Sequence, residues 1–136
     1  MPALPWKDEY NINVAVIDKQ HRRLSELAGR VHEVLESNPQ GGQDIRQIVD
    51  DLLSFTRLHF TTEEELMLKY EYPGYEAHRA AHKQVLYRLG TLAELSEQPM
   101  RLATRIDPDA SDDWVTSHLL DKDAQLGKFL NEKGVF

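Results

Sequence analysis

The chain has 136 residues, which suits a single domain, and 40% of them are hydrophobic and 29% charged, as in an ordinary globular protein. Its formal net charge of −7 argues against a surface that binds nucleic acid or anionic membranes, and no apolar run approaches the roughly 20 residues of a membrane span. The chain has no cysteine, which excludes disulfides and thiolate chemistry and leaves His, Asp and Glu as metal ligands.

We predict four amphipathic helices after an N-terminal arm. Residues 1–17 contain two prolines and the alternating run INVAVI, which indicates an extended arm packed on the body. Asp18 is placed to cap a first helix over about 18–37, in which apolar residues recur every three or four positions. The stretch NPQGG at 38–42 breaks this helix, and a second helix is predicted over about 43–70.

The second half of the chain continues this pattern. A turn with Pro and Gly at 71–74 precedes a third helix over about 75–97. Residues 98–110 contain two prolines and predict a loop, and Ser111 is placed to cap a last helix over about 111–131. Four amphipathic helices with short connections predict an all-α fold, an antiparallel up-down four-helix bundle with an extended N-terminal arm.

Polar residues continue the apolar stripes of these helices. In an up-down bundle the start of the first helix lies beside the end of the second and the start of the third, so polar residues at these places converge on one end of the core. Side chains four apart also share one face of a helix. The residues concerned are His21 on the first helix, His59 and Glu63 on the second, His78 and His82 on the third, and His118 with Asp121 or Asp123 on the last.

The joint arrangement of five imidazoles and two carboxylates favours a metal centre, although each pair alone is more often a surface pair. Burying these groups without partners would cost on the order of several kcal/mol for each unpaired charge, and a metal removes that cost. Seven ligands exceed the four to six that one ion accepts, so we expect two ions that share the carboxylates. Ligation by nitrogen and oxygen without sulfur suits iron, zinc, copper or nickel.

The motifs that carry these residues resemble those of the hemerythrin family in its bacterial single-domain form. They are His21, HFTTEE with Met67, YPGYEAHRAAH and WVTSHLLDKD. The resemblance extends from Trp6 to about Leu130 and implies one hemerythrin-like domain over 1–136. It also implies a cofactor of two iron ions, a non-haem di-iron centre with an oxo or hydroxo bridge, which binds dioxygen reversibly.

The resemblance implies a role for each ligand position. Three histidines would fill the coordination of one iron: His78, His82 and His118. Two histidines would leave the other iron with an open site: His21 and His59. Two carboxylates would bridge the irons: Glu63 and Asp123.

The last of these assignments depends on the resemblance. Asp121 is three residues after His118 and shares its helix face, whereas Asp123 is five residues on and about 140° away on an ideal helix. The family's spacing is five, so the resemblance favours Asp123, and a local wide turn of the π type would bring it round. Asp121 is then expected to be a solvated surface acid.

Apolar residues beside the ligand positions are assigned to a dioxygen pocket, which must admit a small apolar gas and keep water out. They are Leu24, Phe60, Trp114, Val115 and Leu119.

Other residues near the motifs are given no ligand role. Glu64 and Glu65 are expected to point away from the inward stripe into solvent, and His32 is too far from His21 to join the same site. Two departures from the family pattern concern the surroundings of the site. Leu126 stands where the family commonly has tyrosine, and the stretch around Pro108 interrupts a region that is usually helical.

The function favoured by the resemblance is reversible dioxygen binding, as carrier, store or sensor. Histidine-rich ligation stabilises high-valent iron less than carboxylate-rich ligation does, and no acid-base residue lines the predicted pocket, so we expect no enzyme. The alternatives are a di-iron enzyme acting on peroxide, dioxygen or nitric oxide, an iron-binding or iron-sensing module, and a helical interaction domain. We expect dioxygen as the partner of a cytoplasmic monomer, without nucleic acid or membrane, since the first residues lack a signal-peptide pattern.

Overall fold

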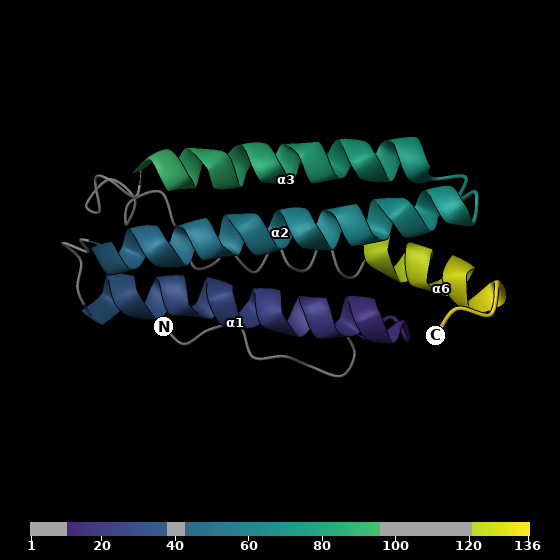
Figure 1. Ribbon diagram of the computed structural model, residues 1–136, viewed down its shortest axis with the longest axis horizontal. Coiled ribbons are helices and arrows are strands. Elements are labelled where there is room, and N and C mark those ends of the chain that lie inside the picture. The colour runs from purple at the N-terminus through teal and green to yellow at the C-terminus, as the bar shows by residue number, and fades with distance from the viewer. Residues whose placement is uncertain (1–10, 38–42, 96–120) are drawn as a thin grey trace.

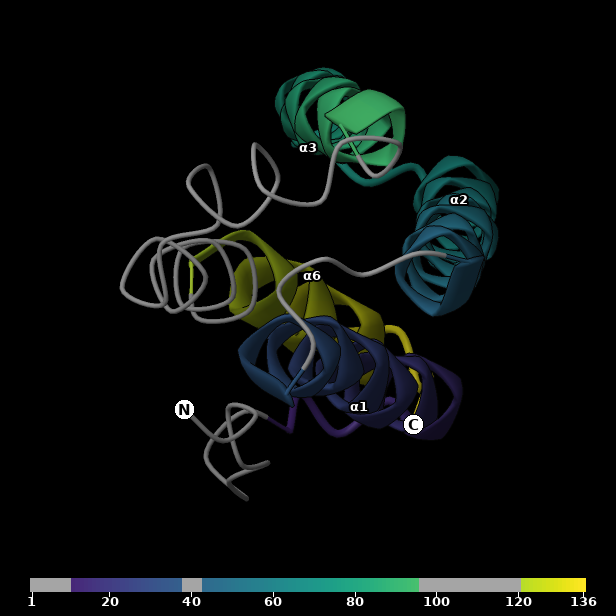
Figure 2. The same cartoon turned by 90° about the vertical axis from the view of Figure 1, so that its left-hand side faces the viewer.

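The structure is a computed structural model that describes residues 11–37, 43–95 and 121–136. These residues form four helices and no strand: α1 (Ala15–Ser37), α2 (Gln43–Lys69), α3 (Tyr75–Leu95) and α6 (Ala124–Glu132). Successive helices run in opposite directions (Figure 1), and the view along the bundle shows them around a common axis (Figure 2). The predicted all-α antiparallel bundle is therefore confirmed.

Helix α1 begins three residues earlier than the sequence pattern indicates. The N–H of Asp18 already donates to the carbonyl of Val14 at 2.9 Å, as in a helix that starts at Ala15. Asp18 therefore does not cap the helix from outside. Its carboxylate instead accepts the backbone N–H of Ile12 at 2.7 Å, which ties the preceding segment to the first turn. The rest of the predicted arm, residues 1–10, lies outside the described residues.

A tight turn joins α2 to α3. Glu71 has a φ of 55°, a left-handed conformation that commonly ends helices, and the N–H of Tyr72 donates to the carbonyl of Met67 at 2.8 Å. The next helix starts at once, because the N–H of His78 donates to the carbonyl of Gly74 at 3.0 Å. The short turn holds the end of α2 beside the start of α3, at the right of Figure 1.

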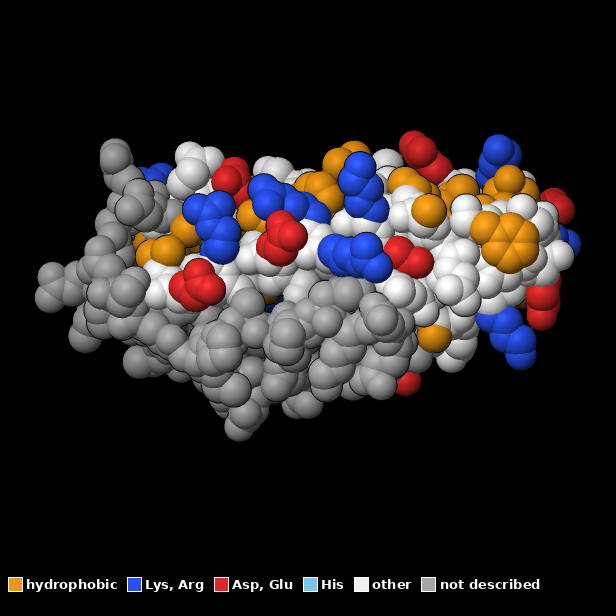
Figure 3. Space-filling view, turned by 90° about the horizontal axis from the view of Figure 1, so that it is seen from below, with side chains coloured by type: hydrophobic (Ala, Val, Ile, Leu, Met, Phe, Trp, Pro, Cys, Tyr) orange, Lys and Arg blue, Asp and Glu red, His pale blue; other side chains and the backbone are white. Residues whose placement is uncertain are grey.

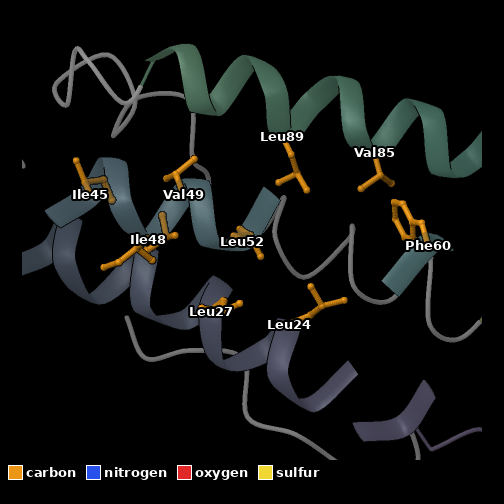
Figure 4. Packing of buried hydrophobic residues seen from close by; sticks show 10 residues of the cluster. Leu24, Leu27, Ile45, Ile48, Val49, Leu52, Phe60, Val85 and Leu89 are labelled. Atoms are coloured by element: carbon orange, nitrogen blue, oxygen red, sulfur yellow. The ribbon is translucent and has the colours of Figure 1, made fainter. Parts of the chain in front are cut away.

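Buried apolar side chains form two separate clusters. The first core cluster fills the space between α1, α2 and α3, where side chains from the three helices point toward one another (Figure 4). Its members are Leu24, Leu27, Val31, Ile45, Ile48, Val49, Leu52, Phe60, Val85 and Leu89. The second core cluster brings together the segment before α1, the first turn of α1, the end of α2 and helix α6. Its members are Ile12, Val14, Ile17, Met67, Leu126 and Leu130.

The outer faces of the described helices carry many charged side chains among scattered hydrophobic ones. Basic and acidic side chains are interspersed on the face seen in Figure 3, and on α1 the guanidinium of Arg23 donates to the carboxylate of Glu26 at 3.1 Å. Within the described ranges, no helix is both long enough and apolar enough to cross a membrane.

Candidate metal centre

A layer of buried polar residues separates the two core clusters. Along α1, His21 lies between Ile17 of the second core cluster and Leu24 of the first. On α2, His59 and Glu63 lie between Leu52 of the first cluster and Met67 of the second. On α3, the two histidines lie between Tyr75, which packs against the second cluster, and Val85 of the first. The buried residues of this layer are His21, His59, Glu63, His78, His82 and Asp123. Six of the seven predicted ligand positions therefore meet in one place, and the seventh, His118, lies outside the described residues.

The first half of the layer gathers α1, the end of α2 and the start of α6. The Nε2 atom of His21 lies 3.1 Å from Nε2 of His59 and 2.7 Å from Oδ2 of Asp123. Glu63, one turn after His59, brings its Oε1 to 3.6 Å from the Nε2 atom of that histidine. All four residues are buried, and each offers one ligand atom within 4.8 Å of the other three.

The second half uses the start of α3 and the same two carboxylates. The Nε2 atom of His82 lies 2.9 Å from Oε1 of Glu63, and Nε2 of His78 lies 2.9 Å from Oδ1 of Asp123. These four residues again offer ligand atoms within 4.8 Å of one another. Glu63 and Asp123 thus belong to both halves, and the two oxygens of Asp123 face different halves.

The position of Asp123 depends on an irregular start of the last helix. Residues 121–123 form a π-helical turn directly before α6, where a wide turn was expected. An aspartate at this place often caps a helix, but the Asp123 side chain makes no capping hydrogen bond and has helical φ and ψ angles of −73° and −32°. Its carboxylate points into the site instead. Asp121 is exposed, as expected for a surface acid.

The electrostatics of this layer disfavour two bare carboxylates. Burial raises the pKa of Glu63 well above its ordinary value, and the negative charge of Asp123 raises it further. Imidazole nitrogens and carboxylate oxygens that converge in a dry interior need protons or a cation between them. A divalent ion would satisfy several of these atoms at once, and His, Asp and Glu side chains are suitable ligands for transition metals. The donor set therefore fits a metal centre.

The outward ring nitrogens of two histidines have acceptors that sequence reasoning missed. The Nδ1 atom of His59 lies 2.8 Å from Oε1 of Gln20, and that of His82 lies 3.1 Å from Oε2 of Glu64. The expectation that Glu64 points into solvent is therefore wrong, whereas Glu65 is exposed as expected. A signal existed for Glu64, because it lies one turn after the inward Phe60 and shares its helix face.

The described members of the predicted dioxygen pocket belong to the first core cluster. Leu24 and Phe60 are both buried there. The ring of Phe60 stacks on that of His82, with centroids 3.8 Å apart and planes 6° from parallel. These contacts leave the pocket assignment a prediction, and its other members lie outside the described residues: Trp114, Val115 and Leu119. The predicted cap at Ser111 and the stretch around Pro108 lie outside them as well.

A tyrosine from the turn between α2 and α3 lies at the edge of the site. The rings of Tyr72 and His78 meet edge to face with centroids 6.4 Å apart. Burial raises the pKa of Tyr72, and the negative charge of Asp123 adds to the shift. Leu126, which stands where the family commonly has tyrosine, is fully buried in the second core cluster with Tyr72 packed against that cluster.

Comparisons with known proteins agree with this arrangement. The family model of the hemerythrin HHE cation binding domain matches residues 13–130. The bacteriohemerythrin of Stenotrophomonas maltophilia is 30% identical over 97% of this chain and 90% of its own length. That of Pseudomonas aeruginosa is 28% identical over 91% of this chain and 79% of its own.

Solved structures share the fold. A crystal structure of wild-type hemerythrin matches with a TM-score of 0.76 at 23% identity, and the match covers 93% of this chain and 97% of the other. At this identity the likeness supports the fold alone. The family model, however, spans most of the sequence and includes every described residue of the polar layer. The chain therefore belongs to the hemerythrin family.

Proposed function

We propose that this protein binds dioxygen reversibly at a non-haem centre of two iron ions. The main support is that two buried groups of four possible metal ligands have Glu63 and Asp123 in common. Residues that belong to both groups are what a pair of ions with common carboxylate ligands requires. When bound, the two irons would supply the electrons and the coordination position that reversible dioxygen binding needs.

The described residues divide between the two ions by their contacts. His21 and His59 would bind one ion, because their Nε2 atoms lie 3.1 Å apart. His78 and His82 would bind the other ion, because the centroids of their rings lie 4.6 Å apart. The resemblance adds His118 as the third histidine of this ion. This division leaves the ion beside His21 and His59 with fewer protein ligands, and so with room for a small molecule.

The surroundings favour binding over turnover. Leu24 and Phe60 are the described residues assigned to the dioxygen pocket, and both are buried apolar side chains without a proton to donate or accept. On the side that these two residues cover, the wall excludes water and supplies no proton to a bound dioxygen. The relatives named above are bacteriohemerythrins, which supports the same choice.

The experiment that tests this function is an iron titration followed by a visible spectrum. We expect two irons per chain in the reduced protein, and an absorption band that appears in air and fades when dioxygen is removed under argon. A band that does not fade over repeated cycles would contradict reversible binding and indicate an oxidase or a redox sensor. One iron or none would contradict the di-iron centre itself.

The ligand assignment is tested by His59→Ala. The imidazole of His59 lies beside the ligand atoms of His21 and Glu63. Its removal should lower iron loading from two ions toward one, measured by metal analysis after gel filtration. His32→Ala is the matched control, because His32 lies eleven residues along α1 from His21, roughly 16 Å on a helix. Equal loss of iron in both variants would contradict the assignment.

A further inference from the structure

Two histidines of the polar layer are oriented by hydrogen bonds to acceptors of different charge. His59 meets the amide oxygen of Gln20, and His82 meets the carboxylate of Glu64. In both rings these bonds involve Nδ1, on the side away from the site, while Nε2 faces the carboxylates of the layer. An acceptor at Nδ1 determines which nitrogen carries the proton and which keeps a lone pair for a metal.

For His59 the direction of the hydrogen bond at Nδ1 follows from the neighbours of Gln20. The hydroxyl of Thr62 donates its single proton to the backbone carbonyl of Leu58 at 3.0 Å. It must then accept from Gln20, whose Nε2 lies 3.1 Å away. The other end of that amide, Oε1, accepts the Nδ1–H of His59. The chain of bonds begins at a backbone carbonyl of α2 and ends with the His59 lone pair at Nε2, directed into the site.

For His82 the acceptor is a carboxylate held from a second side. One oxygen of Glu64 accepts the Nδ1–H of His82 at 3.1 Å, and the other lies 3.6 Å from the guanidinium of Arg79. The ring of Phe60 stacks on the imidazole and fixes its plane. An ionised carboxylate accepts more strongly than an amide does, so it shifts more electron density onto the imidazole.

We propose that Gln20 and Glu64 are positioning residues that direct the Nε2 lone pairs of His59 and His82 at the metal centre, and that the carboxylate makes the His82 half the stronger ligand set. The proposal rests on the proposed metal centre for its consequence, but its geometric part concerns the protein alone. The result is a centre whose two halves bind metal unequally even before their different ligand numbers are considered.

The geometric part is tested by nuclear magnetic resonance of the metal-free protein with ¹⁵N-labelled histidine. We expect His59 and His82 both to carry a proton at Nδ1. Thr62→Val removes the hydroxyl that orients Gln20 and should increase the Nε2-protonated form of His59. Thr62→Ser keeps that hydroxyl and should leave the spectrum as in the wild type. Thr61→Val, at an exposed neighbouring position, is the control. Nδ1 without a proton in both wild-type rings would overturn the proposal.

The inequality is tested with zinc, which is diamagnetic and accepts the same ligands. We expect two zinc ions of different affinity, measured against a competing chelator. Glu64→Gln should weaken the tighter ion by about 10–100-fold, the usual effect of losing such a partner. Gln20→Glu should tighten the weaker one. Glu65→Gln, at the exposed next position, should change neither.

These outcomes separate the inference from the proposed function. Failure of the wild-type protein to bind two ions would contradict the di-iron centre, while the nitrogen spectra would still decide whether Gln20 and Glu64 set the tautomers. Two bound ions with no difference between Glu64→Gln and Glu65→Gln would contradict the inequality and leave the metal centre intact.

Discussion

Glu63 is the residue at which folding and metal binding oppose each other most directly. Its carboxyl group is fully buried, and its Oε1 lies within 3.6 Å of an Nε2 atom from each of three histidines: His59, His78 and His82. Burial and the charge of Asp123 both raise the pKa of Glu63, so its ionised form is costly in the absence of metal. A metal ion would bind that same ionised form. Protons and metal therefore compete for one side chain.

The metal-free protein should lose stability as pH rises above the ordinary pKa of a glutamate. In the unfolded chain Glu63 has an ordinary pKa of about 4.3, and in the folded protein its pKa is higher. The folded state therefore binds more protons between these two values, and the free energy of unfolding should fall as pH rises through this window. The stabilisation from protonated Glu63 is fully present below the pKa that Glu63 has in the unfolded chain.

Glu63→Gln removes this ionisation. Relative to wild type, the variant should gain roughly 1.4 kcal/mol of stability near neutral pH for each unit by which folding raises the pKa of Glu63. Urea unfolding of the metal-free proteins from pH 4 to pH 8 would measure it. Glu65→Gln, exposed on the same helix, is the control. A pH profile of Glu63→Gln that matches wild type would show that Glu63 does not carry this dependence.

At the scale of elements, the segment before α1 and helix α6 approach each other more closely than side chains usually allow. A Cβ atom added at Gly127 would lie 2.6 Å from Cβ of Ile12 and 2.7 Å from its backbone oxygen. Asn131 adds a hydrogen bond from its side-chain amide to the carbonyl of Asn13 at 3.0 Å. This contact holds α6 beside the start of α1, and so holds Asp123 beside His21.

Gly127→Ala should therefore destabilise the protein although alanine favours helices. The backbone of Ile12 cannot move aside as a flexible side chain could, so we expect a loss of about 1–3 kcal/mol, the usual cost of overpacking. Gly90→Ala in α3 is the matched control, because nothing lies within 4 Å of its added Cβ. That change should stabilise by about 0.5–1 kcal/mol. Chemical denaturation of both variants would measure the difference, and equal effects would refute the close contact.

At the scale of the whole molecule, the bundle has an apolar half and a half that contains the polar layer. The first core cluster holds one half together by burial of aliphatic side chains. In the other half, buried imidazoles and carboxylates take the place of some aliphatic side chains. The cost of removing them from water lowers the free energy of unfolding of that half until a cation neutralises them. Metal binding should therefore stabilise the half of the bundle that contains the polar layer more than the apolar half.

Hydrogen exchange would detect this inequality. Saturating zinc should slow amide exchange more in residues 17–25, 56–67 and 75–85, which surround the polar layer, than in residues 45–52, which belong to the first core cluster. The free energy of unfolding should also rise, by about 2.7 kcal/mol for each ion whose dissociation constant is a hundredfold below the free zinc concentration. An equal slowing in both halves would contradict a locally unstable polar layer.

The sequence alone was sufficient for what depends on neighbours along the chain. Apolar residues three and four apart predicted α1, α2 and α3 to within a few residues, and the turns followed from proline and glycine. The pairs His59–Glu63 and His78–His82 share helix faces because of the same spacing. Antiparallel connection then placed these pairs at one end of the bundle together with His21. Asp123, by contrast, followed only from the resemblance to the family, because helix spacing alone favoured Asp121.

Only the tertiary structure decided the features that depend on how helices are rotated and spaced against one another. Gln20 and Glu64 became partners of His59 and His82 because α1 meets α2 and α2 meets α3 at those levels. The two oxygens of Asp123 reached different histidines because a π-helical turn precedes α6. Local periodicity specifies which face of a helix points inward, whereas a hydrogen bond of about 3 Å requires a relative placement that no single segment contains.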